Sequence, residues 1–122
     1  MTKHGGRRVE FGLEERTARF GEAVVLFAKR IPVTLVTTPL IPQLVRAGTR
    51  MGANYLDADD ADSKKDFRYR IGVARREARE TKHQLRMVVA AVPELRDEAR
   101  ALWQEAKELN LIFGAIRRSG EG

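Results

Sequence analysis

Apolar and small residues recur in this chain at spacings of three and four residues, through four successive segments. The first segment carries this pattern at Leu13, Thr17, Phe20, Val24, Phe27 and Ile31. Similar spacings return around Leu40 to Ala58, Phe67 to Val92 and Leu95 to Ile116. Such spacing keeps one face of a helix turned toward partner helices. The pattern predicts an all-α protein.

Prolines and a run of acids separate these segments. Pro32 ends the first segment and Pro93 separates the last two, because proline interrupts the hydrogen bonds of a helix. We predict helices over residues 12–31, 39–61, 64–92 and 94–118, within a domain spanning 12–119 and preceded by a flexible tail at 1–11. The connections are too short for crossovers, so the expected fold is an antiparallel up-down-up-down four-helix bundle.

The composition excludes several classes of protein. A chain of 122 residues suits a single domain. It contains no cysteine, which removes disulfides and thiolate chemistry and fits the reducing cytoplasm. No apolar stretch approaches the roughly 20 residues that span a bilayer. We therefore expect a cytoplasmic protein without membrane contact.

No pattern of catalytic or metal-binding residues is evident. The only histidines are His4 and His83, too few for a histidine zinc site at helical spacing. Numbered from Asp57, a calcium-binding loop would need glycine and glutamate where the chain has Asp62 and Arg68. Phosphate-binding and nucleophile motifs are also absent. We expect no catalytic residue, metal or cofactor, and keep a carboxylate- or metal-dependent enzyme as the remote alternative.

The net charge of +6 is concentrated in one segment. Residues 64–86 contain nine bases and three acids, so the rest of the chain is close to neutral. Five of the bases follow a helical stripe beside the apolar positions, and a sixth lies next to it: Arg68, Arg75, Arg79, Lys82 and Arg86, with Arg76. A row of cations can follow a phosphate backbone and release its counterions. These six residues are the predicted nucleic-acid-binding surface, for RNA or DNA.

One other interpretation of this charge remains open. The bases could pair with acids on neighbouring helices, such as the run at residues 57–62. The chain would then be a protein–protein interaction scaffold without nucleic-acid binding. Only Phe67 and Tyr69 lie among the bases as aromatic residues, so base stacking on single strands is not favoured.

The second predicted helix has a wider apolar face than one bundle requires. The surplus stripe consists of Ile41, Val45, Gly52 and Leu56, which we predict to form a homo-oligomer interface. Asn54 lies at the edge of this face, and we predict that it is buried and hydrogen-bonded to a neighbouring helix. Ser63 and Asp66 have the spacing of a capping box and predict the start of the third helix.

The middle of the chain resembles a known family. Gln43-Leu44-x-Arg46, Gly52 to Tyr55, Asp57, Ser63-x-Lys65-Asp66-Phe67 and Glu77-Ala78-x-Glu80-Thr81 occur in order. These elements resemble the four-helix-bundle proteins encoded in intervening sequences of large-subunit (23S) ribosomal RNA genes. The resemblance implies a ring-shaped homo-oligomer, a pentamer, with no established catalytic activity. It also implies distant kinship to accessory proteins of diversity-generating retroelements, which bind nucleic acid and a reverse transcriptase.

Overall fold

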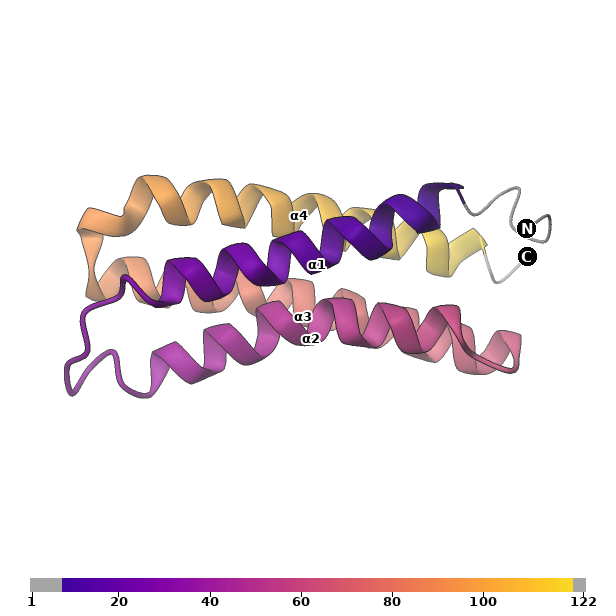
Figure 1. Cartoon of the computed structure of the whole chain (residues 1–122), viewed down its shortest axis with the longest axis horizontal. Helices are drawn as coiled ribbons and strands as arrows, with labels where there is room; N and C mark the ends of the chain where they lie inside the picture. Colours follow the sequence, from indigo (N-terminus) through magenta and orange to yellow (C-terminus); the bar gives the residue numbers. More distant parts are fainter. Residues whose placement is uncertain (1–7, 120–122) are drawn as a thin grey trace.

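The chain folds into four long helices that run alternately up and down. The computed structural model describes residues 8–119, with side chains described from residue 12 onward. The helices are α1 (Arg8–Ala28), α2 (Leu40–Asp59), α3 (Lys64–Ala91) and α4 (Arg96–Ser119), and a 3₁₀ turn, η2 (Pro93–Leu95), precedes α4. Figure 1 shows them side by side along one long axis. The all-α fold and the four-helix bundle are as predicted.

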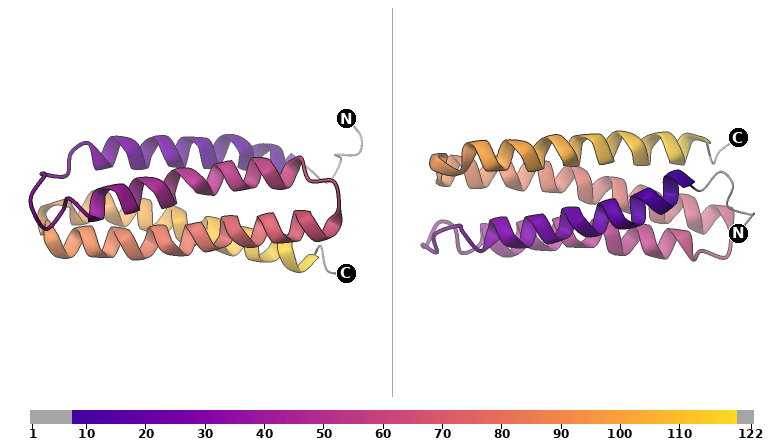
Figure 2. Two further views of the ribbon diagram at one scale, coloured as in Figure 1. Left: turned by 90° about the horizontal axis from the view of Figure 1, so that it is seen from below. Right: turned by 45° about the horizontal axis from the view of Figure 1, so that its top comes forward.

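The helices follow one another around the bundle in chain order. α2 packs against α1 and α3, and α3 packs against α4, whereas the contact between α1 and α4 is the slightest. The two views of Figure 2 show the same neighbours. Each helix therefore turns one flank toward each neighbour, and the charges on these flanks distinguish them.

The helix ends differ from the prediction mainly in α1. This helix begins at Arg8, not at residue 12, and ends at Ala28, three residues before the predicted end. The early end has a cause, because the ring of Pro32 would clash with the carbonyl of Ala28 in a continued helix. The chain instead tightens, with the Ile31 amide donating to the Ala28 carbonyl at 3.1 Å. The predicted flexible tail lies outside the described residues at 1–7, and residues 8–11 belong to α1.

The other helix bounds agree within two residues. α2 begins at Leu40 and ends at Asp59, and α3 begins at Lys64, where the prediction placed it. Ser63 caps α3, because its side-chain oxygen accepts a hydrogen bond from the Asp66 backbone amide at 3.0 Å. This bond satisfies one of the amides that a helix start leaves unpaired.

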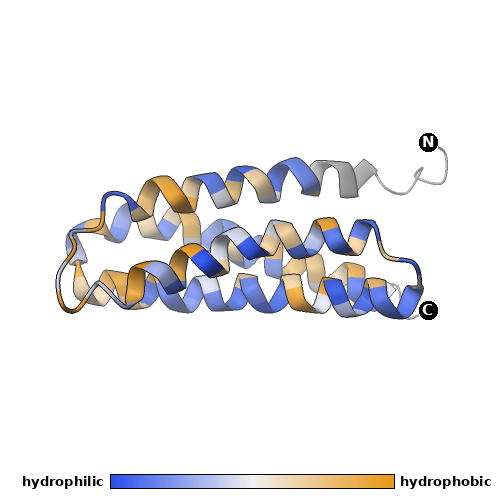
Figure 3. Cartoon of the chain, turned by 60° about the horizontal axis from the view of Figure 1, so that its bottom comes forward, coloured by the Kyte–Doolittle hydropathy of each residue, from blue (hydrophilic) through white to orange (hydrophobic). Residues whose placement is uncertain are grey.

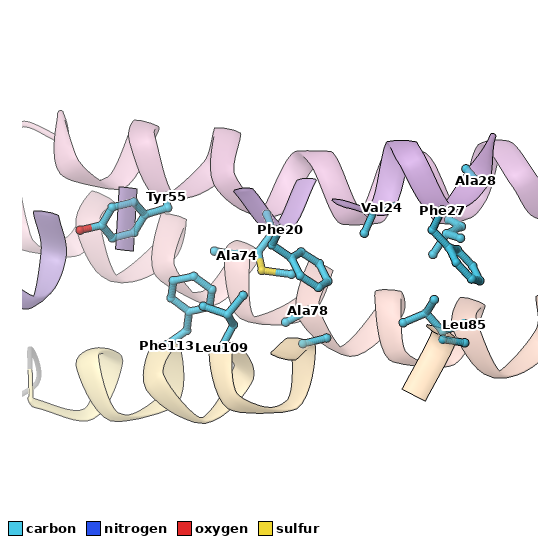
Figure 4. Packing of buried hydrophobic residues seen from close by; sticks show 14 of the residues in the cluster. Phe20, Val24, Phe27, Ala28, Tyr55, Ala74, Ala78, Leu85, Leu109 and Phe113 are labelled. Carbon is cyan, nitrogen blue, oxygen red and sulfur yellow. The ribbon is translucent and has the colours of Figure 1, made fainter. Parts of the chain in front are cut away.

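The predicted seams form the core. Figure 3 shows hydrophobic and hydrophilic stretches alternating along each helix. Of the first seam, every member from Leu13 to Ile31 is buried. Figure 4 shows aromatic and aliphatic side chains of all four helices meeting between the ribbons, among them Phe20, Phe27, Tyr55 and Phe113. The rings of Tyr55 and Phe113 lie 6.1 Å apart, within the range of favourable aromatic pairs.

Candidate nucleic-acid interface

The predicted stripe of bases lies on the flank of α3 that faces α4. This flank follows the spacing four, three, four and three beside the buried seam, and its positions are Arg68, Gly72, Arg75, Arg79, Lys82, Arg86 and Val89. Arg79 and Arg86 are exposed, whereas Arg68, Arg75 and Lys82 are half-buried against the neighbouring helix. Arg76 is exposed one position away, on the outer side of α3. The structure thus brings five of the six predicted residues into one row.

The facing flank of α4 carries a second row of bases, which the sequence prediction missed. Its positions repeat the same spacing and are Arg96, Arg100, Trp103, Lys107, Asn110, Gly114 and Arg117. Arg118 adjoins this row. The spacing of these bases can be seen in the sequence, because the row has the same period as the α3 stripe. That the row faces α3 can be known only from the structure, which shows which flank of α4 turns toward α3.

Specific contacts join the two rows. The Asn110 side-chain nitrogen donates a hydrogen bond to the Arg75 carbonyl at 3.1 Å. The Lys82 ammonium lies 5.3 Å from the centre of the Trp103 ring, and the Lys107 ammonium lies 5.6 Å from it. Both distances are within the range of cation–π attraction. The ring therefore bridges a lysine from each helix in the middle of the groove.

Two glycines make room for arginine side chains in this groove. A methyl group placed on Gly72 would lie 3.1 Å from Nε of Arg117. A methyl group on Gly114 would lie 3.4 Å from an Arg118 nitrogen and 3.6 Å from Nε of Arg75. The guanidinium groups therefore lie close to the helix backbones. Nε of Arg75 and Nε of Arg117 are buried and have no hydrogen-bond partner among the described residues.

We call this surface the α3–α4 basic groove. Its cations are Arg68, Arg75, Arg79, Lys82 and Arg86 of α3, with Arg96, Arg100, Lys107, Arg117 and Arg118 of α4. Within residues 12–119, neither flank has an aspartate or glutamate at any of its positions. At one end of the groove, Asp62 shares a hollow of about 480 Å³ with Arg68 and Ser119.

The acids lie on the other flanks, where they form ion pairs. Arg70 of α3 lies 3.8 Å from Asp57 of α2, and Arg50 of α2 lies 3.6 Å from Glu77 of α3. Burial, and then the charge of nearby Glu80, raise the pKa of Glu77 above its ordinary value. The acid run before α3 thus pairs with Arg70, on the side of α3 opposite the groove. For Arg75, Arg79, Lys82 and Arg86, no ion pair occurs within the described part of the chain.

An open depression lies in the groove at its α3–α4 turn end. It has a volume of about 640 Å³, and its apolar floor comes from Leu85, Val89 and Ala99. Its rim and wall come from Arg86, Arg96, Arg100, Trp103 and Gln104. Arginine and tryptophan side chains thus surround an apolar surface.

The predicted oligomer stripe is only partly a free surface. A methyl group on Gly52 would lie 3.2 Å from the Thr17 hydroxyl oxygen, so this glycine faces α1 of its own chain. Ile41 and Val45 are half-buried against the chain's own core, whereas Leu56 is 49% exposed. The small residue predicted for self-association thus serves close packing of α1 on α2.

The prediction for Asn54 is right about burial and wrong about its partner. Asn54 is 4% exposed. Its side-chain nitrogen donates to the Arg50 carbonyl at 2.9 Å, one turn earlier in α2, not to a neighbouring helix. A bond within one helix satisfies the amide without fixing the register between helices.

No group of three or more histidine or carboxylate side chains suited to a metal ion occurs in residues 12–119. Among the described helices, none is long and apolar enough to cross a membrane.

Comparison with known proteins yields a structural relative. No family model matches the chain, and no curated protein matches it. A solved structure from Bacteroides thetaiotaomicron VPI-5482 is similar, with a TM-score of 0.75 and 23% sequence identity. The match covers 86% of this chain and 94% of that one, which is described as a protein of unknown function from the S23 ribosomal protein family. At this identity the likeness shows a shared four-helix fold.

Proposed function

We propose that this chain is a non-enzymatic, self-associating bundle that binds nucleic acid along the α3–α4 basic groove. The observation that carries the proposal is the pair of facing basic rows with no acid at their positions. On other flanks, several bases have acids beside them, as Arg70 has Asp57 and Arg50 has Glu77. Cations such as Arg79 and Arg86, which have no ion pair within residues 12–119, concentrate an anionic partner and steer its approach.

The dimensions of the groove favour a polyanion over a single small anion. From Arg68 to Arg86 the α3 row extends over about 27 Å, at about 1.5 Å of rise per residue. Arginine also presents a planar fork of donors that suits phosphate oxygens. A nucleic-acid backbone supplies phosphates in a row, so one strand can engage the whole length.

Two further points support the proposal. The structural relative is described as belonging to a ribosomal protein family, which is consistent with an RNA partner. Self-association is supported by apolar side chains exposed at the α1–α2 connection, Val33, Leu35 and Val36, of which Leu35 is 96% exposed. This connection carries orange segments in Figure 3. Exposed apolar patches mark contact surfaces, and the family resemblance makes a pentamer the expected assembly.

A titration at several salt concentrations tests nucleic-acid binding. Fluorescence anisotropy of a labelled single-stranded RNA measures the association constant. The logarithm of this constant should fall linearly with the logarithm of salt concentration. The expected slope is about 0.7 per phosphate contacted, or about 0.9 on duplex DNA. Light scattering on the same protein should give a multiple of the 13.8 kDa chain mass. Absence of binding by micromolar protein at low salt would favour the interaction scaffold instead.

A further inference from the structure

The depression at the α3–α4 turn end differs from the rest of the groove, because it is apolar at its floor. We propose that it takes an unpaired nucleobase, stacked on Trp103, while the adjoining phosphates lie on Arg86, Arg96 and Arg100. This inference rests on the proposed function, and it names single-stranded nucleic acid as the preferred ligand. It also assigns base stacking to Trp103 of α4. From the sequence, only Phe67 and Tyr69 of α3 had been considered for that role.

The chemistry of the lining matches a flat aromatic group attached to phosphate. Leu85 and Ala99, at 1% and 2% exposed, form an apolar floor that offers a phosphate no hydrogen bond. Three arginines at the rim are equally unsuited to a purely apolar ligand, since it would leave their donors unpaired. An apolar pocket with a few polar groups is typical of sites for small ring systems. A nucleotide combines both properties.

Trp103 contacts a lysine from each helix and also lines the depression. Lys107 lies one turn further along α4 than Trp103, and Lys82 precedes the α3 residues of the depression. Both ammonium groups lie over the ring, at 5.3 Å and 5.6 Å from its centre. The ring also lines the depression, on the side toward Arg100. A base in the depression would meet the ring there, and the exposed Lys107 side chain can swing aside to free a face for stacking.

Base stacking would make the groove selective for strand type. The bases of a duplex are paired and stacked on one another, so they cannot enter a side pocket without unpairing. A single strand can turn one base into the depression and keep its phosphates on the arginine rows. Phosphate contacts alone would bind either form of nucleic acid.

An abasic strand separates stacking from charge. We would compare single-stranded RNA with an abasic strand of equal length, which keeps the phosphates and lacks the bases. The intact protein should bind the base-bearing strand about five- to 150-fold more tightly, the range typical of one stacked base. Trp103→Ala should lose most of this difference and bind the abasic strand as the intact protein does. Tyr69→Ala is the matched control, because Tyr69 is 59% exposed on α3 and lies outside the groove.

A second measurement needs no substitution. Trp103 is the only tryptophan in the chain, so tryptophan fluorescence, excited selectively over tyrosine, reports on this site alone. The base-bearing strand should quench this emission strongly, and the abasic strand should leave it nearly unchanged at saturation. This readout also serves if Trp103→Ala fails to fold, which circular dichroism would reveal.

The outcomes distinguish the two proposals. If neither strand binds at low salt, the proposed function itself is wrong. If both strands bind with equal affinity and neither quenches Trp103, the charge-based proposal stands and the base site is overturned. A nucleoside monophosphate that binds as tightly as the strand would also overturn it, because the depression would then be a site for a free nucleotide.

Discussion

The two flanks of α4 carry opposite charges and have opposite relations to their neighbours. Toward α1, Arg16 donates to both carboxylate oxygens of Glu105, at 2.6 and 2.8 Å, and to Glu108 at 2.8 Å. Arg30 likewise binds Glu98. Toward α3, the flank is basic and meets a second basic flank. One set of charges is therefore neutralised within the fold, whereas for Arg96, Arg100 and Lys107 of the other flank no ion pair occurs within residues 12–119.

Under the proposed function, this difference separates charges that stabilise the fold from charges that bind a ligand, on a single helix. The α1–α4 contact is the slightest in the bundle, so ion pairs there add attraction where apolar packing is limited. α3 and α4 pack extensively, yet the margins of that contact are electrostatically repulsive. Stability alone gives no reason for such an arrangement, whereas binding of a polyanion does.

Reversal of charge in the groove should have the largest effect. We expect Arg79→Glu with Arg86→Glu to weaken RNA binding at low salt by about 100-fold or more, since each reversal replaces a phosphate contact with repulsion. Both side chains are exposed, so the fold should persist. Anisotropy titration measures the loss, and circular dichroism checks the helices.

The matched control places the same reversals on α1. Arg19→Glu with Lys29→Glu changes the net charge equally at exposed positions away from the groove. This variant should bind RNA nearly as well as the intact protein. An equal loss in both variants would mean that net charge, not the groove, determines binding.

The second prediction compares the α1–α2 contact with the α3–α4 contact. A methyl group on Gly48 would lie 2.8 Å from both Cγ atoms of buried Val24, so Gly48→Ala should destabilise the fold by about 1–3 kcal/mol. A methyl group on Gly72 meets the flexible side chain of Arg117, which can move. Gly72→Ala should therefore be neutral or stabilise by up to about 1 kcal/mol, through its higher helix propensity.

Chemical denaturation of both variants measures these changes. If Gly72→Ala proved as damaging as Gly48→Ala, the arginines of the groove would be rigid parts of the packing. They would then be poorly placed to rearrange on a nucleic acid.

The third prediction concerns the acidic flank of α4. Arg16→Ala removes a bidentate, half-buried ion pair, and we expect a loss of about 1 kcal/mol in the free energy of unfolding. The loss should shrink at high salt, because salt screens such pairs. RNA binding should be unchanged. Arg19→Ala breaks only the exposed pair with Glu15 within α1, and should cost a few tenths of a kcal/mol.

The bundle could be predicted from the sequence because the signals that indicate helices lie close together along the chain. The seam spacing and the positions of Pro32 and Pro93 identify four helices and their buried faces without any long-range contact. The start of α1 was missed because the segment before Leu13 contains paired glycines and paired arginines and shows no apolar period, so it was predicted to be a tail. The partner of Asn54 was missed because a polar residue on a buried face has several ways to be satisfied, and the sequence does not distinguish them.

The candidate site was half predicted for a related reason. The α3 row was visible as a run of bases, and its net charge needed no structure. The α4 row is interrupted by Trp103, Asn110 and Gly114, and acids of the other flank alternate with it along the sequence. Its basic character appears only when the helix is viewed by flank. The depression at Trp103 depends on both helices and was beyond sequence analysis.

The smallest expected effect tests the α2–α3 flank, where pairing is incomplete. Burial and the charge of Glu80 raise the pKa of Glu77 above its ordinary value of 4.5, although Arg50, Arg46 and Arg76 act to lower it. The folded protein thus binds a proton more tightly than the unfolded chain does, so ionised Glu77 reduces stability. Glu77→Gln should therefore be slightly more stable than the intact protein at neutral pH.

The pH dependence provides the check. As pH falls below 4.5, Glu77 becomes protonated in both the folded and the unfolded state, and the advantage of the variant should disappear. Urea denaturation at neutral and acidic pH measures the difference. Glu14→Gln, an exposed position on α1, should show little change at either pH. A Glu77→Gln variant that is less stable at neutral pH would show that the 3.6 Å pair with Arg50 outweighs burial. The charges between α2 and α3 would then be neutralised as fully as those between α1 and α4. Of these three helix contacts, only the α3–α4 contact, with its basic groove, would carry charges of one sign.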